Sequence, residues 1–281
     1  MAIELATKYL PYVDEVFTQE SKKSLLTNNN FSFDGADTVK IYKISTSQMN
    51  DYGRSGATSG NWSRYGAVDD LDATTQTMHL EKDRSFTFVI DKLDSMDTGK
   101  TLAGASALAR QIREVVIPEV DCLVYSRMAQ YAGTKPAALT LTKDNIYDQI
   151  LLASKTLDDA MVPEADRVLL VNPDTYRIMK LNPEIIMNTE IGAAERKKGV
   201  IGMLDGAIVV KVPSSRLPKN FGFMLAHPCA TVAPTKLESY KTHTDPPGIS
   251  GELVEGRIVY DAFVLGNKDL GIYYQAIPET T

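Results

Sequence analysis

The tripeptide Gly99-Lys100-Thr101 is the segment of this 281-residue chain that comes nearest to a known catalytic motif. It resembles the end of a phosphate-binding loop, in which backbone amides and a lysine surround the phosphates of a nucleotide. The full pattern also requires a glycine five residues before the Gly-Lys pair, and that position holds Asp94. Asp91 and Asp97 add negative charge that would repel phosphate. The segment therefore favours a helix start, where carboxylates lie near the positive end of the helix dipole.

The other candidates for catalysis lack the spacing that their chemistry requires. Ser250 is followed directly by a glycine, so it does not match the Gly-x-Ser-x-Gly turn of a nucleophilic serine. His227 and Cys229 form one potential metal-binding pair, but no second pair accompanies them. We therefore predict no catalytic, cofactor-binding or metal site. The alternative is an enzyme whose site is not recognised, and Lys100 is where its activity would be sought.

Composition and charge restrict the partners of the chain. It has 36 acidic and 30 basic residues and a net charge of −6, whereas proteins that hold nucleic acid by its phosphates need a basic surface. The densest basic run, Glu195-Arg196-Lys197-Lys198, is interpreted as a solvated loop. No apolar stretch approaches the ~18 residues of a membrane span, and the N-terminus shows no signal-peptide pattern. With only two cysteines, the composition indicates a soluble protein made in a reducing cytoplasm.

One short segment combines aromatic side chains with an arginine, Trp62-Ser63-Arg64-Tyr65. Such a group could stack on single-stranded nucleic acid. Three aspartates follow within the next seven residues, however, and their charges oppose that reading. Because Trp, Tyr and Arg are also the residues enriched at protein interfaces, we interpret the segment as a protein–protein contact.

The first 92 residues do not resemble a compact domain. Residues 1–30 begin with apolar side chains and continue with a polar run, which is typical of an extended arm. Residues 38–46 form a strand-like run, residues 50–66 are rich in glycine, and residues 73–90 return as a second strand. These features predict a long hairpin with a flexible tip. A two-stranded ribbon is marginal in water, and the sequence offers no nearby surface to support it.

The clearest element is a long helix over residues 100–131. Its apolar residues recur at three- and four-residue steps and define one stripe. These residues are Leu102, Ala105, Leu108, Ile112, Val115, Val116, Val120, Leu123, Val124 and Met128. Pro118 lies inside the helix, where it removes one backbone hydrogen bond, so we expect a kink or a division there.

From residue 143 onward the pattern changes to alternating helices and strands. A helix around residues 146–157 precedes a buried strand over 167–171. Asn172-Pro173 then caps and opens a short helix that runs to about Lys180. Further strands are expected over 206–212, 221–226, 252–265 and 270–277. The chain is therefore predicted to have an α+β fold.

Several stretches, in this order and spacing, resemble the HK97-type major capsid proteins of tailed bacteriophages. They include Val116-Ile117-Pro118-Glu119-Val120-Asp121 in the long helix and Val171-Asn172-Pro173 after the buried strand. Gly199-Val200-Ile201-Gly202 leads to Val212-Pro213-Ser214-Ser215-Arg216-Leu217-Pro218, and the late segment is Gly256-Arg257-Ile258-Val259-Tyr260-Asp261-Ala262-Phe263-Val264-Leu265. Each stretch alone is weak, but the resemblance spans nearly the whole chain.

The resemblance implies an HK97-type capsid fold with five parts. They are an N-terminal arm (1–34), an extended hairpin or E-loop (35–92), a peripheral domain with a spine helix (93–142), an axial domain (143–235) and return strands of the peripheral domain (236–281). The hairpin would lie on a neighbouring subunit and the arm would dock on another. The expected contact residues are Tyr9, Tyr12, Phe17, Arg54, Trp62, Arg64 and Tyr65.

The implied function is self-assembly, as pentamers and hexamers, into the icosahedral head shell of a virion. The shell would enclose double-stranded DNA without sequence-specific binding, and it would assemble in the cytoplasm of the host bacterium. A separate scaffolding protein, a portal and a decoration protein are further partners that the resemblance allows. The alternative with the same fold is an encapsulin-like compartment that stores enzymes.

Overall fold

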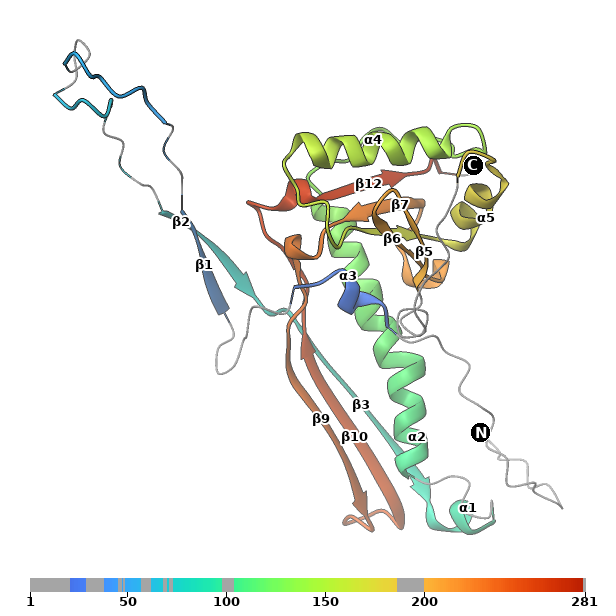
Figure 1. The fold of residues 1–281 in the computed structure, drawn as a ribbon. Coiled ribbons are helices and arrows are strands. Elements are labelled where there is room, and N and C mark those ends of the chain that lie inside the picture. The colour runs from blue at the N-terminus through green and yellow to red at the C-terminus, as the bar shows by residue number, and fades with distance from the viewer. Residues whose placement is uncertain are drawn as a thin grey trace. The chain divides into compact units, whose positions relative to one another are not determined.

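The structure of the chain is a computed structural model that describes residues 21–28, 38–44, 47, 49–56, 62–67, 70, 73–97, 104–185 and 200–279. The chain divides into two compact units, which are described separately. The smaller unit comprises residues 36–79, and the larger unit comprises residues 1–35 and 80–281. Both contain strands, and all the described helices belong to the larger unit (Figure 1).

The smaller unit is an antiparallel ribbon of β1 (Thr38–Ile44) and β2 (Ala73–His79). Thr38 pairs with His79 at one end and Ile44 pairs with Ala73 at the other. β-Branched residues favour an extended backbone in both runs, and Tyr42 adds an aromatic residue to β1. The two strands predicted for this region are thus present, with a long loop between them.

The prediction of one continuous strand over residues 73–90 is wrong. β2 ends at His79, and a separate strand, β3 (Lys82–Asp91), pairs antiparallel with β10 (Gly251–Tyr260). β10 also pairs with β9 (Thr235–Thr244), which completes a three-stranded sheet in the order β3-β10-β9. The alternation of side-chain types correctly indicated that β3 is extended. It could not indicate that β10 lies beside it, because β10 is about 170 residues away in the sequence.

The predicted long helix is present, but Pro118 neither ends nor divides it. It follows α1 (Lys92–Asp97) and consists of α2 (Gly104–Gln111), a π-helical turn η2 (Ile112–Val116) and α3 (Ile117–Tyr131). The backbone stays helical at both junctions of the π turn. Pro118 follows directly as the second residue of α3, so a local change of helix type accommodates the missing N–H.

One face of this helix is buried as the apolar stripe predicts. Val116, Val120, Val124 and Met128 are buried in the core. Val115 is an exception, since 46% of it is exposed. Val115 lies in the same π turn as Val116, but its side chain faces away from the core.

The second part of the larger unit is a mixed five-stranded sheet in the order β12-β7-β4-β6-β5. Its strands are β4 (Val168–Val171), β5 (Val200–Leu204), β6 (Ala207–Lys211), β7 (Phe221–Ala226) and β12 (Ile272–Ala276). β4 and β6 are parallel, and the other neighbours are antiparallel. β5 is a strand that the sequence did not predict.

Two apolar layers pack on opposite faces of this sheet. Val168 and Leu170 of β4 join the core formed with α3, whereas Leu169 and Val171 join the core formed with α4 (Ile146–Asp159). Because β4 carries apolar side chains on both faces and is fully buried, it is the centre of the fold. Figure 1 shows α4 above the sheet and the long helix extending below it beside β3, β9 and β10.

Short elements complete the larger unit. α5 (Pro173–Leu181) begins as predicted, because the Asn172 side chain accepts a hydrogen bond of 2.6 Å from the Thr175 backbone N–H. β8 (Thr231–Val232) pairs with β11 (Phe263–Val264). The 3-10 turns are η1 (Lys23–Leu25), η3 (Ser214–Arg216), η4 (Pro228–Ala230) and η5 (Asp269–Gly271). None of the helices in these described ranges combines the length and apolarity needed to cross a membrane.

Candidate functional site

The loop between β1 and β2 brings most of the predicted contact residues together. The Gly53 backbone N–H donates a 2.9 Å hydrogen bond to the Arg64 carbonyl, which joins the two sides of the loop. The rings of Tyr52 and Tyr65 meet edge to face, with their centroids 5.0 Å apart. Arg54 lies next to this contact and is exposed. Residues 49–56 and 62–67 therefore form one surface, which we call the loop tip.

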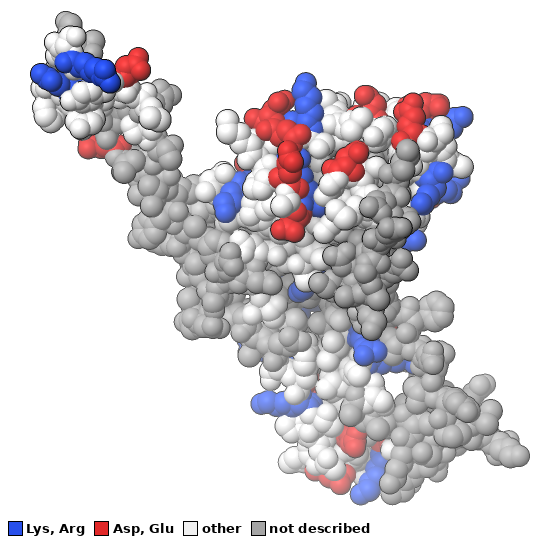
Figure 2. Space-filling model, in the orientation of Figure 1, with Lys and Arg blue, Asp and Glu red and all other residues white. Residues whose placement is uncertain are grey.

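The loop tip exposes large side chains that would be expected to avoid water. Trp62 is 87% exposed, Tyr65 77% and Met49 99%. Aromatic side chains and arginines are the residue types enriched at interface hot spots. Figure 2 shows basic and acidic side chains beside uncharged ones on the described tip of the smaller unit. Sequence reasoning missed Met49 and Tyr52, whose exposure only the loop geometry reveals.

Other predicted residues lie outside the described part of the chain. This is the case for Tyr9, Tyr12 and Phe17 of the N-terminal arm, and for Gly99-Lys100-Thr101. It also applies to the basic run at residues 195–198.

His227 and the two cysteines, Cys122 and Cys229, have structural partners. The His227 imidazole Nδ1 accepts a 3.1 Å hydrogen bond from the Cys229 backbone N–H, and burial lowers the pKa of His227. Burial raises the pKa of both the Cys122 and Cys229 thiols, which favours the less nucleophilic protonated form. Among the residues that the structure describes, no three His, Cys, Asp or Glu side chains are grouped so that they could hold a metal ion.

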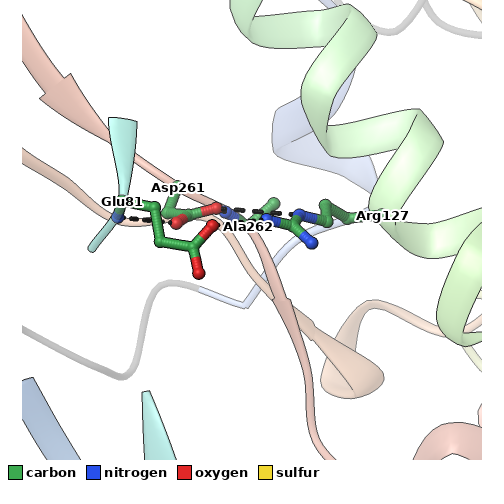
Figure 3. Close-up of polar contacts among 4 residues, drawn as sticks. All are labelled: Glu81, Arg127, Asp261 and Ala262. Atoms are coloured by element: carbon green, nitrogen blue, oxygen red, sulfur yellow. Dashed lines mark hydrogen bonds and ion pairs between the residues drawn. The ribbon is translucent and has the colours of Figure 1, made fainter. Parts of the chain in front are cut away.

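A buried carboxylate, Asp261, organises the start of β3. Its two oxygens accept hydrogen bonds from the backbone N–H groups of Glu81, at 3.0 Å, and Ala262, at 2.8 Å. Arg127 of α3 reaches the same place, with Nη2 3.1 Å from Glu81 Oε2 and Nε 4.0 Å from Asp261 Oδ1 (Figure 3). Asp261 thereby joins α3, the start of β3 and the turn after β10, within the larger unit.

Replacing Asp261 with alanine should destabilise the subunit by about 2–4 kcal/mol, because the backbone N–H groups of Glu81 and of the buried Ala262 lose their acceptor and Arg127 loses a nearby carboxylate. The measurement is the midpoint of urea unfolding. Asp159→Ala removes an exposed carboxylate at the end of α4 and should leave the midpoint unchanged. Equal midpoints for the two variants would show that Asp261 does not organise this junction.

A second buried carboxylate links two of the stretches that carried the family resemblance. Arg216 Nη1 lies 2.8 Å from Asp121 Oδ2, and the two side chains are only 5% and 1% exposed. Asp121 lies on α3 and Arg216 on η3, 95 residues later. Neither residue was singled out from the sequence as a site, because nothing local indicates that they meet.

No protein-family model matches the sequence, and no curated protein matches it. Solved structures do match. The capsid structure of the cyanophage P-SCSP1u has a TM-score of 0.73 at 13% identity, covering 98% of this chain and 93% of that chain. The mature capsid of bacteriophage PhiM1 has a TM-score of 0.71 at 12% identity, and the match covers 100% of this chain and 93% of that chain. The chain has the fold of phage capsid subunits.

The same fold also occurs outside these phages. A virus-like particle from Pyrococcus furiosus matches with a TM-score of 0.53 at 10% identity, covering 87% of this chain and 88% of that chain. At these identities the likeness is one of fold. It confirms the mixed helix-and-sheet capsid fold that the sequence resemblance predicted.

Proposed function

We propose that the chain is the major capsid protein of a tailed bacteriophage, which self-assembles into the icosahedral head shell around double-stranded DNA. The observation that carries this proposal is the match to two phage capsid structures over at least 98% of this chain and 93% of each of theirs. Because so little of either chain lies outside the shared fold, shell building accounts for nearly all of this chain. The virion head would be its final location, after assembly in the host cytoplasm.

The proposed parts of the subunit follow the family pattern. Residues 1–34 would be the N-terminal arm, 35–92 the E-loop and 93–142 the peripheral domain with its spine helix. The long helix and its buried stripe support the last of these. Residues 143–235 would be the axial domain, for which the five-stranded sheet with α4 and α5 is the support.

The last part, residues 236–281, would return to the peripheral domain. Tyr260 of β10 donates a 3.1 Å hydrogen bond to Glu119 of α3, and Ile258 and Tyr260 share the core of this helix, which supports the assignment. β12, however, lies in the five-stranded sheet beside β7. The C-terminal strand β12 would therefore belong to the five-stranded sheet that supports the axial domain.

The proposed partner of the loop tip is a second copy of the chain. Arg54, Trp62, Arg64 and Tyr65, joined by Met49 and Tyr52, would form a contact within or between pentamers and hexamers, and Tyr9, Tyr12 and Phe17 would add contacts from the arm. A contact between different surfaces of identical subunits can repeat around a ring. The net charge of −6 supports enclosure of DNA without tight or sequence-specific binding. A scaffolding protein, a portal and a decoration protein would complete the head.

A second candidate is an encapsulin-like compartment that stores enzymes. The match to the Pyrococcus furiosus virus-like particle is the observation that favours it. Its TM-score of 0.53 is lower than the 0.73 and 0.71 of the two phage capsids, which is why we prefer the phage role.

The deciding experiment is sedimentation of the purified protein, followed by electron microscopy of any megadalton material. Closed icosahedral shells would support the capsid proposal, and shells loaded with an enzyme would support the compartment instead. If only monomers appear, the neighbouring genes are co-expressed to supply a scaffold. The absence of rings and shells even then would contradict both proposals.

A further inference from the structure

Residues 21–28 are an integral part of the larger unit. Leu26 is completely buried in the same core as Val120 and Val124 of α3. The Asn28 backbone N–H donates a 2.7 Å hydrogen bond to the Thr231 carbonyl. Lys22 is only 5% exposed. This segment, which lies within the proposed arm of residues 1–34, is therefore held by apolar packing and by a backbone contact.

The start of this segment is held by a side-chain contact with Asp121. Ser21 Oγ donates a 2.6 Å hydrogen bond to Asp121 Oδ1. Arg216 Nη1 donates a 2.8 Å hydrogen bond to the other oxygen, Oδ2. One buried carboxylate thus joins three segments that are distant in the sequence, namely residues 21–28, α3 and η3.

The energetics of this contact favour a role in positioning. Burial raises the pKa of Asp121, although the Ser21 hydrogen bond and the Arg216 charge act to lower it. Removing both charges from water offsets much of their attraction, so a buried pair adds little net stability but can specify one arrangement. Apolar packing alone would allow the segment to shift along α3. The hydrogen bond from the Ser21 hydroxyl to Asp121 depends on distance and angle, so it defines where Ser21 must lie.

We propose that Asp121 is the anchor of the N-terminal arm, binding Ser21 on one side and Arg216 on the other. The anchor fixes the position of Ser21, so that an arm starting from this residue would reach one defined neighbour. That last step rests on the capsid function proposed above, whereas the anchor itself is a property of the single subunit. Ser21 and Arg216 act as positioning residues through Asp121.

The anchor is tested by limited trypsin digestion of the full-length subunit. Lys22 is buried directly beside the anchor, so cleavage after Lys22 or Lys23 reports local opening of the segment. Ser21→Ala removes one hydrogen bond to a charged group and should accelerate this cleavage on the order of tenfold. Mass spectrometry of the released N-terminal peptides separates these cuts from cleavage elsewhere.

Matched variants separate positioning from general destabilisation. Ser24→Ala alters an exposed serine in the same segment and should be cleaved at the wild-type rate. Ser21→Thr retains the hydroxyl and should restore that rate. Asp121→Asn removes the charge shared by both donors and should accelerate cleavage at least as much as Ser21→Ala. If Ser21→Ala is cleaved at the rate of Ser24→Ala, the anchor is refuted, whatever the stability of the Asp121 variant.

Assembly then tests the role of the anchor in directing the arm. Under conditions in which wild-type subunits form shells, Ser21→Ala should give a lower yield of closed shells than Ser24→Ala. Equal yields, combined with faster cleavage, would show that the anchor holds the segment without directing the arm, and would overturn that part of the proposal. Failure of wild-type subunits to assemble would count against the capsid function, while the digestion result would still decide the anchor.

Discussion

Val116→Asp should unfold the subunit, whereas the same substitution at the adjacent Val115 should leave it folded. Val116 is 8% exposed and packs in the core between the long helix and the sheets, but Val115 is 46% exposed. A carboxylate at position 116 would lose its hydration without gaining a partner, at a cost above about 4 kcal/mol. Since whole domains are stable by only about 5–15 kcal/mol, a cost of this size removes much of the stability, and a modest rise in temperature then unfolds the population.

The measurement is thermal unfolding followed by far-ultraviolet circular dichroism. Val115→Asp adds the same charge to the same π turn, so it controls for changes in net charge and in helix propensity. Ile112 is partly buried, and Ile112→Asp should give an intermediate melting temperature. Matching melting curves for the variants at positions 115 and 116 would show that the buried face of the helix is assigned incorrectly.

Replacing residues 48–70 with the dipeptide Asn-Gly should abolish shells while leaving the subunit folded. The deletion removes the loop tip but retains β1 and β2, whose pairing ends at Ile44 and Ala73. Residues 45–47, Asn-Gly and residues 71–72 then connect the strands, and Asn-Gly favours a turn within that shorter loop. The buried core clusters lie in the larger unit and lose no residue. The expected result is a monomer with the wild-type melting temperature that forms no megadalton species when sedimented.

A finer variant tests which side chains of the loop tip matter. Replacing Tyr52, Trp62 and Tyr65 together with serine should reduce the yield of shells at least tenfold, because hot-spot aromatics at interfaces each contribute about 2 kcal/mol or more. Asp51→Ser with Ser55→Ala alters exposed polar residues of the same loop and should have little effect. Shells of normal yield from the deletion or from the aromatic variant would refute the contact assigned to this loop.

Local chemistry in the sequence determined several elements correctly. Asn172-Pro173 specified the start of α5, because an asparagine cap and a proline in the first turn act within four residues. The three- and four-residue spacing of apolar side chains identified the long helix and most of its buried face. The structure shows the aromatic side chains of Trp62-Ser63-Arg64-Tyr65 exposed, and the protein–protein contact predicted there from residue types stays a prediction.

Only the tertiary structure decided which distant segments meet. β3 could have continued the hairpin, but it pairs with β10, and the alternation of its side chains is compatible with either partner. Asp121 meets Arg216 across 95 residues, and Asp261 accepts the Glu81 N–H across 180. A local sequence pattern indicates which face of a helix or strand is apolar. Which strands pair depends on how the apolar faces of all the helices and strands pack together. For this protein, local sequence patterns determined most of the helices and strands, but not β5, β9 or the break between β2 and β3. The packing of the elements determined those features and the contacts that hold β3 and the N-terminal segment in place.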